Sequence, residues 1–405
     1  MSPRPDKIII RQRYLDKALS FKGISLIKVF TGQRRTGKSY LLHMVANAIV
    51  RMEPHANIIF VDMELMEFAT LNKATELYAS VKSKLKEGVA NYLFIDEVQE
   101  IEDFEQALRS LLNEQVVDIW CTGSNASVLS GELADRLSGR FIEIPVHSLS
   151  YPEFLKFHSV NNDNSSLQLY LKYGGLPNLI HLPLTDEVVF DYLKTINATV
   201  MLKDVVKRHE VRNVAMLENL MRFLADNTGS LFSANSISKF MKVQGQKISV
   251  AILTNYIQYA LDAFYLTKVQ RIDLKGKRHF ETNEKYYFED HGLRNVWIGY
   301  QPMHINKLIE NIVFKHLIGN GYRMFVGVSA AYEVDFIAEK DDKKLYVQCA
   351  YLMESEQTRQ REFRTLLSIR DNFPKLVVTM DEPSGGNIEG VEHWHLRDFL
   401  SCDWQ

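Results

Sequence analysis

The sequence of 405 residues predicts an α/β fold in which a parallel β-sheet lies between two layers of helices. Residues 24–150 alternate short apolar runs with segments of helical periodicity. Runs that are apolar throughout are typical of strands buried on both faces, as in parallel sheets. The expected strands are residues 24–30, 57–62, 92–96, 117–122 and 141–146, and the expected helices include 71–87 and 103–114.

A glycine-rich octapeptide, GQRRTGKS, joins the first expected strand to a helical pattern over residues 40–50. It matches G-x-x-x-x-G-K-[ST], the pattern of the phosphate-binding P-loop. The glycines allow a tight loop whose N–H groups face the phosphates, and the following helix directs its positive end to the same place. Lys38 would meet the β- and γ-phosphates, and the Ser39 hydroxyl would bind Mg²⁺. We expect the nucleotide to contact Gly32, Gln33, Arg34, Arg35, Thr36, Gly37, Lys38, Ser39 and Tyr40.

Two carboxylates follow the apolar run at 92–96, in the order Asp96-Glu97. Asp96, at the end of the strand, is expected to hold Mg²⁺ together with Ser39. Glu97 would orient and deprotonate the attacking water. The alternative is a pair of ordinary surface acids after a core strand. In the chain, the strand expected at 57–62 separates the P-loop from these acids, as in one class of NTPases.

Polar and basic residues follow the next strands. Ser124 and Asn125 both qualify to contact the γ-phosphate or the water, and we favour Asn125; a turn of small polar residues is the alternative. Arg136 and Arg140 could stabilise charge on the transferring phosphoryl group, in cis or across a subunit interface, and we favour Arg140. The alternative for both arginines is a salt bridge at a helix end.

Composition sets limits on the partners. The net charge is −2, with 46% hydrophobic and 24% charged residues, so that any basic site must be local. No apolar run approaches the roughly 20 residues of a membrane span, and the charged N-terminus does not resemble a signal peptide. The three cysteines match no metal spacing. We therefore expect a cytoplasmic protein with no membrane partner.

The middle of the chain is expected to be helical over 151–209, with a break at Gly174-Gly175-Leu176-Pro177, and to form a lid beside the nucleotide. Helical patterns at 214–227, 233–241 and 248–263, followed by a hairpin with its tip at 275–278, predict a winged helix over 210–300. Eight Lys or Arg residues and two Asp lie between 239 and 278. This basic region could bind double-stranded DNA, or it could be a docking face for a protein.

The segment 301–405 is expected to be a separate α/β unit. The order of its elements resembles the PD-(D/E)xK nuclease fold, with carboxylates at Glu310 and Asp335. Where that motif has an acid and a lysine, this chain has Gln348 and Ala350. We therefore expect a fold kept for structure or binding, and rank nuclease activity last.

Five segments in this order, GQRRTGKS, YLFIDEVQE, TGSNASVLS, LSGRFIEIPVHSLSYPEF and YLKYGGLPN, resemble prokaryotic AAA-type ATPases related to the origin-recognition and STAND lineage, which carry a C-terminal domain of unknown function. The resemblance covers nearly the whole chain. It implies a P-loop NTPase sheet of the ASCE/AAA type, followed by a helical lid, a winged helix and a restriction-endonuclease-like domain. We place these at residues 1–150, 151–209, 210–300 and 301–405.

The resemblance also implies ATP and Mg²⁺ as ligands. We expect an Mg-dependent ATPase that acts as a nucleotide-driven switch, with Glu97, Lys38, Arg140 and Asn125 in catalysis. The alternative is a DNA- or protein-binding module that holds ATP and rarely hydrolyses it. The sequence leaves the oligomeric state open.

Overall fold

The computed structural model describes residues 9–126, 139–246, 248–273, 279–328, 332–353, 355–382 and 387–404. The chain divides into two units, which are described separately. The first comprises Met1–Ser148 with Asp262–Phe264, and the second comprises Leu149–Leu261 with Tyr265–Gln405.

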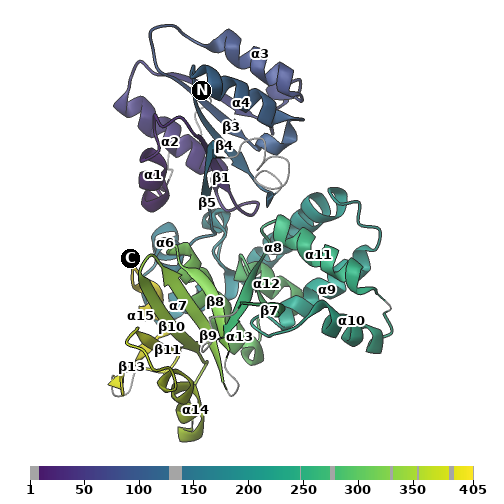
Figure 1. The fold of residues 1–405 in the computed structure, drawn as a ribbon, viewed down its shortest axis with the longest axis vertical. Helices are drawn as coiled ribbons and strands as arrows, with labels where there is room; N and C mark the ends of the chain where they lie inside the picture. Colours follow the sequence, from purple (N-terminus) through teal and green to yellow (C-terminus); the bar gives the residue numbers. More distant parts are fainter. Residues whose placement is uncertain are drawn as a thin grey trace. The chain divides into compact units, whose positions relative to one another are not determined.

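The first unit contains a five-stranded parallel sheet in the order β2-β3-β4-β1-β5 (Figure 1). Its elements are α1 Gln12–Leu19, β1 Ile27–Thr31, α2 Lys38–Met52, β2 Asn57–Asp62, η1 Met66–Phe68, α3 Ala74–Lys84, β3 Asn91–Asp96, η2 Val98–Glu100, α4 Phe104–Glu114, β4 Asp118–Gly123 and β5 Phe141–Pro145. The fold class and the five strands predicted for this region are confirmed.

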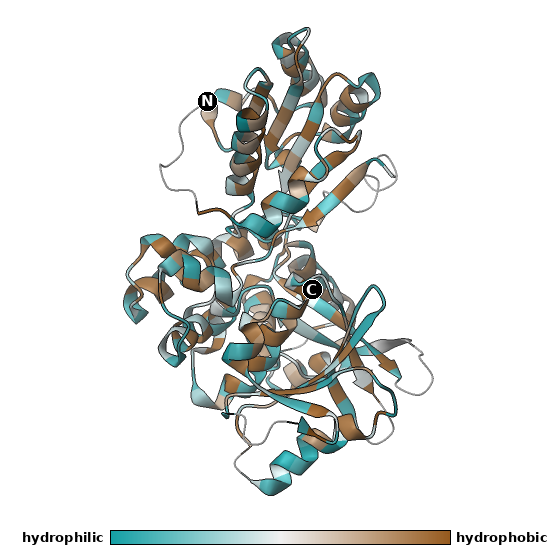
Figure 2. Ribbon diagram, turned by 90° about the vertical axis from the view of Figure 1, so that its left-hand side faces the viewer, coloured by the Kyte–Doolittle hydropathy of each residue, from teal (hydrophilic) through white to brown (hydrophobic). Residues whose placement is uncertain are grey.

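Helices cover both faces of this sheet because its strands are apolar on both sides. Helices α1 and α2 pack on one face, where the rings of Phe60, Phe94, Trp120 and Phe30 form a stacked row across four strands. Helices α3 and α4 pack on the other face. In Figure 2 these strands carry much of the hydrophobic colouring of the unit.

Parallel strands bring their carboxyl ends to one edge of the sheet. Asp62 and Asp96 are paired in register at the ends of β2 and β3, and Thr31 is paired with Gly123 at the ends of β1 and β4. The strand that lies between β1 and β3 is β4, whereas β2 lies on the outer side of β3. Along the chain, β2 lies between the P-loop and the two acids. In the sheet, the strand between β1 and β3 is instead β4.

The second unit combines helices with an eight-stranded mixed sheet, in the order β12-β13-β11-β10-β9-β8-β6-β7. Its elements are α6 Tyr151–His158, α7 Asn164–Tyr173, η4 Pro177–His181, α8 Asp186–Thr199, the π-helical η5 Val200–Lys207, α9 Val214–Asp226, α10 Ala234–Val243, α11 Val250–Asp262, β6 Leu266–Asp273, β7 His279–Phe288, α12 His291–Ile298, η6 Pro302–His304, α13 Ile305–Gly319, β8 Arg323–Val328, β9 Glu333–Lys340, β10 Lys343–Cys349, α14 Glu356–Leu367, β11 Lys375–Thr379, β12 Asn387–Ile388, β13 Val391–His395 and α15 Leu396–Ser401.

The hairpin predicted as a wing is formed by β6 and β7, but it is not isolated. Strand β6 pairs in parallel with β8, so that Arg271 lies opposite Val326 and Asp273 lies opposite Val328. The boundary that we predicted at residue 300 therefore separates strands that the structure joins in one sheet. Pairing between strands so distant in sequence leaves no local signal.

The predicted lid segment also takes part in the core of the second unit. Tyr151 and Phe154 of α6 and Leu167 and Tyr170 of α7 are buried in one cluster with apolar residues of α13, α15 and the sheet. The Gly174-Gly175 break is held by Asp290, whose Oδ2 accepts a hydrogen bond from the Gly175 amide at 2.8 Å. A lid role stays a prediction.

Within the described ranges, no helix combines the length and the apolar character needed to cross a membrane.

Candidate nucleotide-binding site

The P-loop joins β1 to α2, and two of its glycines are required by the geometry. Gly37 is the N-cap of α2 with φ of 97°, a left-handed conformation that glycine adopts readily. At Gly32 a Cβ atom would lie 2.2 Å from the carbonyl oxygen of Val146, so that no side chain fits. The Lys38 ammonium donates to the carbonyl oxygens of Gly32 and Gln33, each at 2.9 Å. Lys38 is only 4% exposed, and these two hydrogen bonds keep its charge beside the loop backbone.

An arginine near the N-terminus, Arg11, hydrogen-bonds to the backbone of this loop. Arg11 is 4% exposed and donates to the carbonyl oxygen of Thr36 at 3.1 Å and to that of His147 at 3.0 Å. Its guanidinium stacks on Tyr14, whose hydroxyl accepts a hydrogen bond from the His147 amide. The segment before β1 thus connects the P-loop with the chain that follows β5.

Asp96 lies at the end of β3, buried beside two hydroxyl groups. Thr122 of β4 donates to Asp96 Oδ1 at 2.6 Å, and Ser39 also hydrogen-bonds to the carboxylate. Burial raises the pKa of Asp96 to about 6, although both hydroxyls favour the charged form. The same Thr122 oxygen accepts a hydrogen bond from the Glu97 amide at 2.7 Å, and so it positions both acids.

Glu97 follows Asp96 directly and has a left-handed backbone with φ of 56°. Its Oε2 accepts hydrogen bonds from Ser124 Oγ, at 2.8 Å, and from Gln99 Nε2. Burial alone would raise the pKa of Glu97, but the charges of Lys38 and Arg34, together with the hydrogen bonds from Ser124 and Gln99, outweigh it and hold the pKa below its usual value. Glu97 is therefore anionic at neutral pH, as a general base must be.

Arg34 is the P-loop arginine that turns inward. It is 7% exposed, and its guanidinium lies 3.9 Å from Glu64 Oε1 and 4.0 Å from Glu100 Oε1. Its effect on the pKa of Glu97 places it within electrostatic reach of that acid. The neighbouring Arg35 and Tyr40 are exposed.

The structure contradicts an action of Arg140 on the nucleotide of its own chain. Arg140 immediately precedes β5, and its carbonyl oxygen accepts from the amide of Ile27, at the start of β1. Its guanidinium donates to Asn113 at the far end of α4. The P-loop follows the opposite end of β1, about 15 Å along the strand. Action across a subunit interface stays a prediction, and Arg136 lies outside the described residues.

Both candidate residues at the end of β4 lie in the turn that follows the strand. Ser124 Oγ donates a hydrogen bond to the Glu97 carboxylate, and its contact with the phosphate or the water stays a prediction. Asn125 is fully buried in the same turn, and its role stays a prediction.

The residues present fit a nucleoside triphosphate with Mg²⁺. The loop excludes a side chain at Gly32, a buried ammonium lies over it, and a hydroxyl and a buried carboxylate, Ser39 and Asp96, supply hard oxygen ligands.

Three further residues of the site, Arg11, Thr122 and Gln99, were not predicted from the sequence. Thr122 could have been found, because it directly precedes Gly123 at a strand end, whereas the partners of Arg11 are remote in sequence.

Comparison with known proteins agrees with this geometry. Residues 25–155 match the model of the AAA domain, and residues 164–304 match that of a domain of unknown function, DUF8612. The Walker-type ATPase of Pyrococcus abyssi shares the fold, with a TM-score of 0.50 and 15% identity over 73% of this chain and 97% of that chain.

Two relatives match over nearly the full length. An "Uncharacterized protein" of Methanocaldococcus jannaschii is 29% identical, covering 92% of this chain and 86% of the relative. An "Uncharacterized protein" of Haemophilus influenzae is 34% identical over 402 residues, covering 97% of this chain and 98% of the relative. The chain therefore contains an AAA domain and belongs to the same family as the Haemophilus influenzae relative.

Proposed function

We propose that the protein binds ATP with Mg²⁺ and hydrolyses it slowly, as a nucleotide-driven switch in the cytoplasm. The observation that carries the proposal is the meeting of Lys38, Asp96 and Glu97 at one edge of a parallel sheet, with each acid in a different protonation environment. Steady-state release of phosphate from ATP, measured with and without duplex DNA, tests it. An intact protein that neither binds nor hydrolyses ATP in the presence of Mg²⁺ would contradict it.

In this proposal the loop amides and Lys38 bind the β- and γ-phosphates. Mg²⁺, when bound by Ser39 and Asp96, neutralises charge on the phosphates. Glu97 accepts the proton of the attacking water, while Ser124 and Gln99 hold its carboxylate in place. Thr122 holds the Asp96 carboxylate and the backbone of Glu97, because its hydroxyl donates to the first and accepts from the second.

In this scheme the charge of Arg34 helps to keep the Glu97 carboxylate ionised. At saturating Mg²⁺ and ATP, the acid limb of the pH profile of kcat then reports the pKa of Glu97. Replacing Arg34 with Ala removes one of the charges that oppose burial, so the pKa of Glu97 rises and the limb moves to higher pH. The matched change Arg35→Ala, at the exposed neighbour, should leave the limb in place. A limb that does not move in the Arg34 variant would exclude this role.

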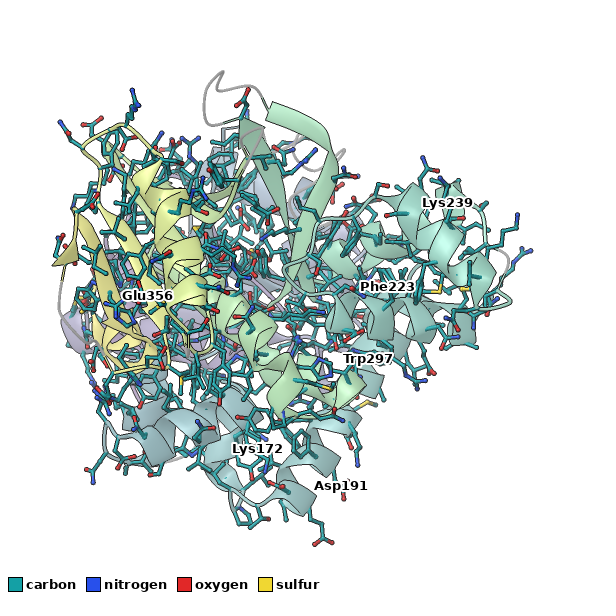
Figure 3. All side chains as sticks on the ribbon, turned by 90° about the horizontal axis from the view of Figure 1, so that it is seen from below. Lys172, Asp191, Phe223, Lys239, Trp297 and Glu356 are labelled. Atoms are coloured by element: carbon teal, nitrogen blue, oxygen red, sulfur yellow. The ribbon has the colours of Figure 1, made fainter. Side chains whose placement is uncertain are left out.

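A second candidate function is binding of double-stranded DNA through the region 239–278. The excess of eight basic residues over two Asp favours it. Lys239, which is labelled in Figure 3, and Lys242 are both exposed on α10. Against it, the same helix exposes Phe240 and Val243, which are 46% and 84% exposed and more typical of a face that binds protein. Lys247, Lys275, Lys277 and Arg278 lie outside the described residues.

Charge reversal at the predicted tip of the hairpin distinguishes DNA binding from protein docking. If DNA is bound, changing Lys275, Lys277 and Arg278 to Glu should weaken retention of a short duplex by at least about 10-fold and reduce its salt dependence. Replacement by Gln in the same three positions should have a smaller effect. A wild-type protein that retains no duplex at low salt would leave protein docking as the function of this surface.

We also propose that residues 305–379 keep the element order of a metal-dependent nuclease fold without its activity. Helix α13 is followed by the antiparallel strands β8, β9 and β10, then by α14 and by β11, which is parallel to β10. Gln348 on β10 lies where that motif would have an acid.

A further inference from the structure

A buried lysine lies among three carboxylates in the second unit. Lys285 of β7 has a side chain that is 1% exposed, and its ammonium lies 2.8 Å from Glu310 Oε1, 2.8 Å from Glu333 Oε1 and 3.3 Å from Asp335 Oδ1. Glu310 comes from α13, which contacts β7, and Glu333 and Asp335 come from β9, which is separated from β7 by β8 and β6 in the sheet order. Lys285 donates hydrogen bonds to Glu310 and Asp335 and forms an ion pair with Glu333.

Other groups also donate hydrogen bonds to two of these carboxylates. Tyr287 donates its hydroxyl to Glu310 at 2.6 Å, and the Cys349 amide donates to Asp335 Oδ2 at 2.9 Å. Gln348 donates to Glu362 at 3.1 Å and accepts from the Asp335 amide at 3.3 Å. The side-chain amide of Gln348 therefore links the backbone of Asp335 to the carboxylate of Glu362 without adding a charge.

Glu333 is exposed, but Glu310 and Asp335 are buried, and carboxylates that are buried this close together require a cation. Burial would lower the pKa of Lys285, but the three acids outweigh it and raise the pKa, so the side chain remains an ammonium. Even with this partner, burial raises the pKa of Glu310 to about 7. Across the described ranges no group of three His, Cys, Asp or Glu residues is arranged to hold a metal ion.

We propose that the Lys285 ammonium is the built-in cation of this carboxylate cluster and closes it to divalent metal ions. The lysine comes from the hairpin that joins the helical part of the unit to its sheet, so one ion-pair cluster ties β7, α13 and β9 together. The region consequently acts as a scaffold, and its acids are not free to bind Mg²⁺ or Mn²⁺. This inference does not depend on the ATPase proposal.

The test removes the charge and offers a metal in its place. The variant Lys285→Met keeps most of the side-chain volume, and calorimetry of the nucleotide-free chain in a chelating buffer should show a Tm lower by about 10 °C. Millimolar Mn²⁺, used here as the probe, should restore much of the loss. Lys344→Met is the matched control, because it removes a lysine paired with Glu339 at 2.8 Å on the same sheet but with both side chains partly exposed.

A double variant keeps the test decisive if Lys285→Met does not fold. Lys285→Met with Glu310→Gln removes one positive and one negative charge, so it should be more stable than the single variant without metal and should respond little to Mn²⁺. Wild type and Lys344→Met should not respond to Mn²⁺ beyond a shift common to all the proteins.

Three results would overturn the proposal. The first is a single variant as stable as wild type. The second is a destabilised variant that Mn²⁺ does not rescue and that Glu310→Gln does not improve. The third is Mn²⁺ binding by wild type that Asp335→Asn abolishes, which would instead identify an open metal site.

Discussion

Replacing Glu97 with Gln is expected to leave the affinity for ATP and Mg²⁺ close to that of wild type and to lower kcat by about 100-fold or more. The change is isosteric, and the side-chain oxygen can still accept from Ser124 and Gln99. It removes the negative charge that Lys38 and Arg34 stabilise and with it the ability to accept a proton from water. The measurement is steady-state phosphate release at saturating ATP, with binding followed by titration of a non-hydrolysable analogue.

The matched control is Glu102→Gln, the same chemical change at an exposed position five residues further along the chain. It should leave both binding and turnover unchanged. If Glu97→Gln hydrolyses ATP at the wild-type rate, the base is another group, and the roles that we propose for Ser124 and Gln99 are wrong with it.

Replacing Lys38 with Ala is expected to raise the Kd for ATP by at least about 100-fold, since it removes a charge-assisted contact to the phosphates at a buried position. It also leaves the carbonyl oxygens of Gly32 and Gln33 without their shared donor. Circular dichroism should show that the variant remains folded. Lys82→Ala, which removes an exposed lysine paired with Glu114 in the same unit, is the control and should bind as wild type.

An Lys38→Ala variant that binds and hydrolyses ATP normally would place the nucleotide elsewhere. Weakened binding by both lysine variants would point to a nonspecific charge effect rather than to a P-loop contact.

The sequence predicted the first unit well because its signals are local. The strand ranges follow from short apolar runs, and Lys38, Ser39, Asp96 and Glu97 belong to motifs whose spacing is set by a loop and a strand end. The edge at which they meet follows from the parallel arrangement alone. The helices at 214–226, 234–243 and 250–262 were also predicted, from their helical periodicity.

What the sequence did not predict depends on contacts between distant residues. The pairing of β6 with β8 joins two segments that we had assigned to separate domains. Lys285 and its acids lie 25 to 50 residues apart, so that no spacing rule connects them. The position of Arg140 away from the P-loop follows from the parallel pairing of β5 with β1, which joins segments distant in sequence.

A structure of the protein crystallised with Mg²⁺ and a non-hydrolysable ATP analogue tests the central claim most directly. We expect the β- and γ-phosphates within hydrogen-bonding distance of the Lys38 ammonium and of the loop amides, with Mg²⁺ between Ser39 and Asp96. A P-loop in which Lys38 still binds the carbonyls of Gly32 and Gln33, with the nucleotide bound at another place or absent at saturating concentration, would contradict the account.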